Sequence, residues 1–175
     1  MFETPNFELV VESALRGFET NGRVVSIEQA SYENEYDIFV DWFRQQEGKW
    51  TGKLVRFAGL AVYGWMPTIL RAEGRNGIRR PVNFDNVADL MLKNEKGQIA
   101  RDFLNGSVVG TSKFLHFWQP DYFAIWDSRI RDRLGVSPYE NQMICVERYY
   151  RDMRQASEKF EKSLRQIELA IFVDR

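Results

Sequence analysis

Apolar residues recur at intervals of three and four along most of the chain. Because an α-helix turns once in about 3.6 residues, this spacing gathers the apolar side chains on one face of a helix. Thr4 or Asn6 is available to cap the first helix predicted in this way. The apolar face of that helix consists of Phe7, Val10, Val11, Ala14, Leu15 and Phe18.

The next stretch of the chain continues the helical pattern. Residues 54–65 are apolar on almost every side, which is typical of a helix that runs through the core. Pro67 suits the first turn of a short helix over residues 66–72. Residues 23–28, RVVSIE, favour an extended backbone, but one short stretch forms no sheet. Before residues 54–65, a helix that ends ahead of Gly48 has an apolar side of Tyr36, Ile38, Phe39, Trp42 and Phe43.

The second half of the chain is also predicted to be helical. Residues 71–81 contain two glycines and a proline and are predicted to form a loop. A helix capped by Asn83 or Asp85 follows and is expected to end at Gly97. Further helices are predicted over residues 98–104, 139–155 and 158–172. The pattern predicts an all-α fold, with residues 1–175 forming one compact domain of about eight to ten helices.

The composition fits a folded globular protein and argues against a membrane span, a disulfide framework and a metal site. Hydrophobic residues make up 44% of the chain, and no apolar run approaches the roughly 20 residues that span a bilayer. The acidic start of the chain lacks the basic region of a secretory signal, so we expect a cytoplasmic protein with no membrane partner. One cysteine, Cys145, and one histidine, His116, argue against a disulfide framework and a zinc site. No metal and no cofactor are therefore expected.

The charge is nearly balanced, at a net −1, which argues against a protein that coats nucleic acid non-specifically. The middle third of the chain is mildly positive, which permits a phosphate-contacting face. Within it, one glycine-containing loop is either a solvated surface or a clamp for DNA phosphates. Its arginines are Arg71, Arg75, Arg79 and Arg80.

The segment GTSKFLHFWQPDYFAIWDSRIRDRLG, residues 110–135, contains the candidate chemistry. We interpret Gly110 as the end of a turn and Thr111 or Ser112 as the cap of the helix that follows. The free N–H groups of such a helix start are a natural phosphate site, which here includes Gly110, Thr111 and Ser112. Lys113 then lies in the first turn, where the helix dipole lowers the pKa of a lysine and favours a neutral amine nucleophile.

A second charged residue of this segment is Asp127, which precedes a predicted helix and is an N-cap candidate. One short helix and a turn separate Asp127 from Lys113, and such a hairpin is able to bring the two together. Two alternatives stay open: Lys113 is an exposed helix residue or a simple phosphate contact, and Asp127 is only a cap.

Aromatic residues of the same segment are candidates for a substrate pocket. His116 lies three residues after Lys113 on the same helical face. Trp118, Phe123 and Trp126 offer flat apolar walls on which an extruded base is able to stack. The alternative is that these side chains pack in the core.

On these residues, the chain resembles the helix-hairpin-helix DNA glycosylase superfamily over residues 98–135. It is similar to uncharacterised bacterial and phage proteins described as having an 8-oxoguanine DNA glycosylase fold. The resemblance implies that Lys113 attacks the sugar C1′ and that Asp127 acts as acid/base and electrostatic partner. The glycosylase hairpin has a proline and closer glycines that are missing here. Ser112 occupies the place of the family's lysine, one residue before Lys113.

The functions that follow fall into different classes. The first is a DNA N-glycosylase-like enzyme, a hydrolase of base excision that acts on a flipped damaged or modified base in double-stranded DNA. The alternatives are a catalytically inactive DNA- or nucleotide-binding module of the same fold and a phage-type DNA base-modification transferase. A helical interaction protein without nucleic acid is the last alternative, and neither enzyme activity nor oligomeric state follows from the sequence.

Overall fold

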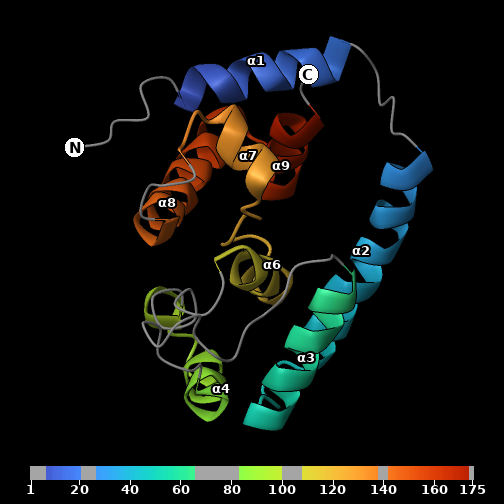
Figure 1. Ribbon diagram of the computed structural model, residues 1–175, viewed down its shortest axis with the longest axis vertical. Coiled ribbons are helices and arrows are strands. Elements are labelled where there is room, and N and C mark those ends of the chain that lie inside the picture. The colour runs from blue at the N-terminus through green and yellow to red at the C-terminus, as the bar shows by residue number, and fades with distance from the viewer. Residues whose placement is uncertain (1–6, 21–26, 66–82, 100–107, 138–141, 174–175) are drawn as a thin grey trace.

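A computed structural model describes residues 7–20, 27–65, 83–99, 108–137 and 142–173 (Figure 1). These ranges are mostly helical and contain no strand, which confirms the all-α prediction, while the glycosylase-like hairpin stays a prediction. Residues 96–99 form an additional helical turn. The helices with described bounds are α1 (Phe7–Thr20), α2 (Ile27–Gln45), α3 (Gly52–Trp65), α4 (Phe84–Leu92), α6 (Val108–Trp118), α7 (Ser128–Arg133), α8 (Gln142–Phe160) and α9 (Leu164–Val173).

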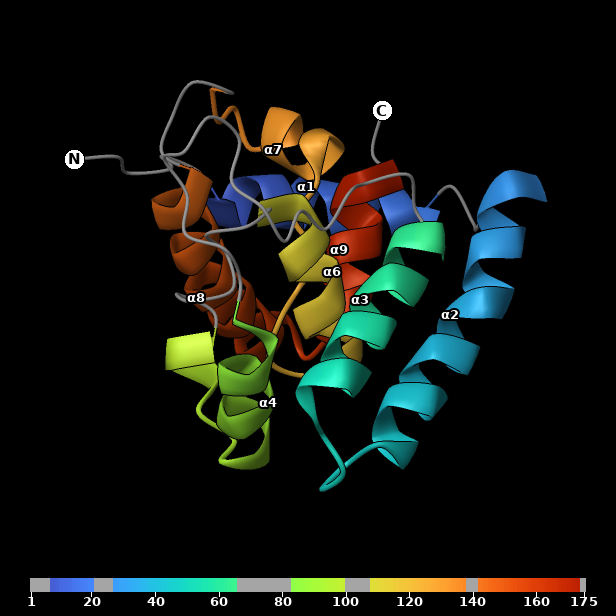
Figure 2. The same cartoon turned by 60° about the horizontal axis from the view of Figure 1, so that its bottom comes forward.

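Helix α6 lies at the centre of the arrangement and packs against α2, α3 and α8 (Figures 1 and 2). Helix α1 packs along α9, and α9 also contacts α7 and α8. Helix α3 also packs against α4. Within the described ranges, no helix has both the length and the apolar character needed to cross a membrane.

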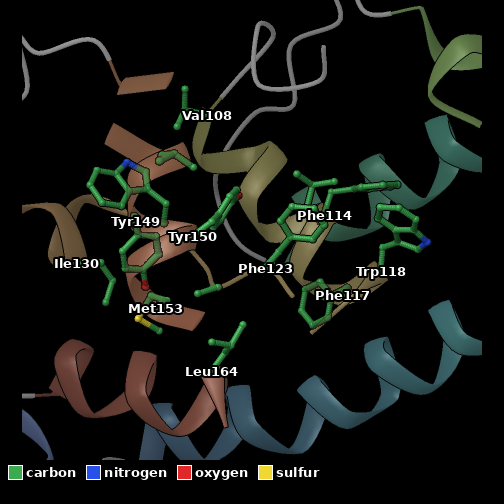
Figure 3. Close-up of a cluster of buried hydrophobic side chains, with 14 of the residues drawn as sticks. Val108, Phe114, Phe117, Trp118, Phe123, Ile130, Tyr149, Tyr150, Met153 and Leu164 are labelled. Carbon is green, nitrogen blue, oxygen red and sulfur yellow. The ribbon is translucent and has the colours of Figure 1, made fainter. Parts of the chain in front are cut away.

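Aromatic side chains fill the space around α6. Phe114 and Phe117 project from α6 toward α2, where the ring of Phe43 lies 5.3 Å and 6.0 Å from theirs, centroid to centroid. On the α8 side, Tyr150 contacts Phe123 edge-on at 5.1 Å. Figure 3 shows the two groups of rings on opposite sides of Phe123. This packing explains why α6 is buried at every position except Val109.

The structure corrects the expectation that residues 54–65 run through the core. They lie in α3 as predicted, but Phe57 and Leu60 are 60% and 61% exposed. Helix α3 is covered on one face only, by α4 and α6. The predicted cap of α4 is confirmed at Asn83, whose Oδ1 accepts hydrogen bonds from the amides of Asp85 and Asn86, both at 3.1 Å.

Two helix ends differ from those predicted. Helix α4 ends at Leu92, and Asn94 with φ of 55° makes the turn that was assigned to Gly97. Helix α8 continues to Phe160, and the break comes at Glu161 with φ of 53°. The chain thus stays helical between the two helices predicted over residues 139–155 and 158–172, and the last turns of α8 bury Met153 and Ala156.

Some sequence predictions fall outside the described residues. These are the extended stretch up to residue 26, the short helix and arginine loop of residues 66–82, and most of the helix over residues 98–104. Ile27 and Glu28, the last residues of the extended stretch, lie in α2.

Candidate active site around Lys113

Helix α6 begins at Val108, three residues before Thr111 and four before Ser112, the two predicted caps. Gly110, Thr111 and Ser112 therefore lie inside the helix, and the side chains of Thr111 and Ser112 are 1% and 0% exposed. The capping prediction is wrong because burial of Val108 and the residues after it outweighs the poor helix propensity of glycine. A phosphate-binding role for residues 110–112 stays a prediction, and two of their side chains face the interior.

The hydroxyl of Ser112 connects α6 to the segment that leads into Asp127. The Trp126 amide donates to Oγ of Ser112 at 3.0 Å. The single hydroxyl hydrogen has two carbonyl acceptors within reach, that of Trp126 at 3.0 Å and that of Val109 at 2.9 Å. Because Ser112 precedes Lys113 and Trp126 precedes Asp127, these hydrogen bonds hold the two charged residues in neighbouring positions.

Replacing Ser112 by alanine is expected to lower the free energy of unfolding by about 1–3 kcal/mol, because the buried Trp126 amide loses its hydroxyl acceptor. Urea denaturation measures the change. The matched control is Ser128→Ala on the exposed first residue of α7, for which a change within about 0.5 kcal/mol is expected. Equal effects of the two substitutions would contradict the anchoring role of Ser112.

Lys113 is buried, with 4% of its surface exposed, in the second turn of α6. Burial lowers the pKa of the Lys113 amine, while the negative charges of Asp127 and Glu168 raise it. The expected direction of the pKa shift is therefore present, but its cause is loss of hydration and not the helix dipole. A lysine in this state is more readily available as a neutral amine than one on the surface.

Asp127 caps α7, as predicted. Its backbone is extended, with φ of −137° and ψ of −176°, and its Oδ1 accepts a hydrogen bond from the Ile130 amide at 2.9 Å. The side chain is half-buried. Because Asp127 raises the pKa of Lys113, the two groups lie within electrostatic range of one another.

A buried carboxyl that the sequence analysis missed completes this cluster. Glu168 on α9 is 3% exposed and accepts a hydrogen bond from Nη1 of Arg165 at 2.7 Å. Burial raises the pKa of Glu168; Arg165 and Lys113 lower it, and Asp127 raises it. The sequence position of Glu168 could have predicted its burial. Glu168 falls on the apolar face that α9 presents to the core with Leu164, Ile167 and Ile171.

His116 is fully buried and has two hydrogen-bond partners. Its Nδ1 lies 2.6 Å from the carbonyl oxygen of Phe123 and its Nε2 lies 2.7 Å from the hydroxyl of Tyr36. A carbonyl only accepts, so Nδ1 carries the hydrogen and Nε2 accepts from Tyr36. Burial lowers the pKa of His116 to about 3, Arg165 adds to this shift, and the bond to Phe123 opposes it. His116 is thus a neutral link between α6 and α2.

The predicted pocket aromatics Trp118, Phe123 and Trp126 are all buried in the core. Trp126 and Phe123 are each 1% exposed, and Trp126 packs against Tyr149 with centroids 5.2 Å apart. Trp118, at 9%, lies beside a surface hollow of about 220 Å³ whose walls include Phe43 and Trp50. Of the three, Trp118 alone has a face next to a described cavity.

The remaining candidate residues are the arginines of the predicted phosphate clamp. Arg71, Arg75, Arg79 and Arg80 lie outside the described ranges. Among the residues that the structure describes, no three His, Cys, Asp or Glu side chains gather as a metal site would require.

Comparison with known proteins gives no family. No family model, no curated protein and no solved structure matches the chain.

Proposed function

We propose that the chain is a DNA N-glycosylase-like enzyme that acts on a flipped damaged or modified base, with Lys113 as the nucleophile and Asp127 as the acid/base and electrostatic partner. The supporting observation is the buried Lys113 amine within electrostatic range of two carboxyl groups, Asp127 and Glu168. Carboxylates of this kind take up a proton from the amine and stabilise positive charge on a sugar.

The chemistry follows from these groups. The lone pair of Nζ of Lys113 forms a bond to C1′ as the glycosidic bond breaks. The base leaves with the electron pair of the broken glycosidic bond and takes up a proton. The amine transfers a proton to Asp127. Opening of the C1′–O4′ bond, with the ring oxygen protonated, then yields a Schiff base between Lys113 and the sugar.

The burial of Lys113 favours a second candidate, a catalytically inactive DNA- or nucleotide-binding module of the same fold. With 4% of Lys113 exposed and Trp126 and Phe123 in the core, the cluster acts in this case as a buried ion network. The two candidates differ in whether an adduct forms on Lys113.

Borohydride trapping tests the proposal, because hydride reduces a Schiff base to a stable amine. Wild-type protein is incubated with duplex oligonucleotides carrying damaged or hypermodified bases, and adducts are resolved by mass. We expect an adduct with wild type and with Lys93→Ala, which removes an exposed lysine. We expect none with Lys113→Ala or Lys113→Met, whose folding is checked by circular dichroism.

Asp127→Asn is the matched variant for the second residue. Asparagine caps a helix about as well as aspartate, so α7 is retained while the negative charge is lost. The rate of adduct formation is expected to fall on the order of 100-fold. Salt-sensitive DNA binding without an adduct on any substrate would favour the binding module, and absence of DNA binding would contradict both candidates.

A further inference from the structure

An exposed apolar surface extends across α2 and α3. Ile38 on α2 is 67% exposed, and Phe57 and Leu60 on α3 are 60% and 61% exposed. Trp42 is half-buried, and its ring lies 6.1 Å from that of Phe57, centroid to centroid. We call Ile38, Trp42, Phe57 and Leu60 the α2–α3 patch.

Helices α2 and α3 lie side by side and run in opposite directions (Figure 2), and the rings of Trp42 and Phe57 join the two halves of the patch. The contact between Trp42 and Phe57 shows that these two residues lie at the same position along the two helix axes. Ile38 is one turn before Trp42, and Leu60 is about one turn after Phe57, so both lie farther from the connecting turn, toward the same end. Apolar surface gathered in this way is typical of a protein interaction site.

Other exposed apolar residues in the described ranges are scattered. Leu9, Leu92 and Ile144 lie on α1, α4 and α8, one on each helix. Single exposed apolar residues are ordinary on protein surfaces. The α2–α3 patch differs because its members come from neighbouring turns of adjacent helices.

The exposed residues around the patch are mainly acidic on α2 and basic on α3. On α2, Glu35 and Asp41 are exposed and flank Ile38 three residues on either side. Asp41 also forms an exposed ion pair of 3.5 Å with Arg44 on the same helix. On α3, Lys53 and Arg56 are exposed on the same face as Phe57 and Leu60. One half of the patch is therefore acidic and the other half is basic.

We propose that the α2–α3 patch binds a second copy of this chain, with α2 of each protomer packed on α3 of the other. A two-fold axis parallel to the helices produces this pairing. Rotation about this axis leaves the position of each residue along the helices unchanged. Because Trp42 and Phe57 lie at one level, Asp41 of one protomer then faces Arg56 of its partner. An axis across the helices places α2 on α2, acid against acid, which the charges disfavour.

Sedimentation equilibrium of the full chain tests the apolar contact. Wild type is expected to associate reversibly to twice the 20.6 kDa of one chain. Leu60→Asp is expected to raise the dimer dissociation constant at least on the order of tenfold. Ile144→Asp is the matched control, since Ile144 is 63% exposed on α8, and it leaves the dissociation constant unchanged.

Charge exchange tests the pairing itself. The α2 variant carries Glu35→Lys and Asp41→Lys, and the α3 variant carries Lys53→Glu and Arg56→Glu. Each variant alone places like charges opposite one another at both contacts of the dimer and is expected to be monomeric. Mixed together they restore opposite charges at both contacts, so a heterodimer is expected.

Three results would overturn the proposal. These are a wild-type chain that stays monomeric over the whole dilution series, equal effects of Leu60→Asp and Ile144→Asp, and a mixture of charge variants that does not associate. A circular dichroism spectrum equal to that of wild type shows that a monomeric variant is folded. The measurements involve no DNA, so they are independent of the role of Lys113.

Discussion

Replacing Trp126 by alanine lowers the free energy of unfolding by about 3–5 kcal/mol. The side chain is 1% exposed and packs against Tyr149, so its removal leaves a cavity and forfeits the transfer free energy of a large ring. Most single domains are stable by only about 5–15 kcal/mol, and the loss is therefore a large share of the total.

Urea denaturation of wild type, Trp126→Ala and Trp126→Phe measures the effect. The phenylalanine variant keeps part of the ring volume and is expected to fall between the other two. Ile144→Ala on exposed α8 is the control, with an expected change within about 0.5 kcal/mol. A cost below about 1 kcal/mol for Trp126→Ala would show that the indole is an accessible pocket wall, as the sequence analysis considered.

The second large effect is a loss of stability in acid that depends on His116. Burial holds the pKa of His116 at about 3 in the folded chain, whereas an unfolded histidine has a pKa of 6.5. Below that value the unfolded chain binds a proton that the folded chain does not bind. The contribution of His116 to stability is thus fully present above pH of about 6.5 and falls by about 1.4 kcal/mol per unit as the pH decreases toward 3.

The His116→Gln variant isolates this contribution because glutamine does not titrate. Between pH of about 6.5 and 4.5, wild type is expected to lose about 2–3 kcal/mol more than the variant. Burial raises the pKa of Glu168, which acts in the opposite sense, but Glu168 is present in both proteins and cancels in the difference. Parallel pH profiles of the two proteins would contradict a buried neutral His116.

Periodicity was sufficient to predict the helices, because the spacing of apolar residues depends only on helix geometry. The apolar spacing located α1. The capping residues Asn83 and Asp127 located the starts of α4 and α7. The sequence pattern failed at the start of α6, where Gly110 and Thr111 look like a turn in isolation. Their place in the helix is set by packing against distant segments, which no local pattern contains.

The candidate site was predictable to a smaller extent. Lys113 and Asp127 were found through their place in a hairpin, and they do lie within electrostatic range. The burial of Lys113 was missed because it depends on neighbours far away in the chain. Glu168 on α9 is one of them, 55 positions after Lys113. The partner of His116, Tyr36 on α2, is 80 positions away and was missed for the same reason.

The segment of residues 123–126 is neither helix nor strand, and all four of its residues are buried in the core. Several of its backbone groups bond to side chains: the Phe123 carbonyl to His116, the Ile125 carbonyl to the Tyr149 hydroxyl at 3.1 Å, and the Trp126 amide to Ser112. Buried backbone groups need such partners wherever water is excluded. Ser112, His116 and Tyr149 thus supply hydrogen-bond partners of the kind that a neighbouring strand supplies in a β-sheet. Replacing these three side chains with apolar ones would therefore leave buried backbone groups without hydrogen-bond partners.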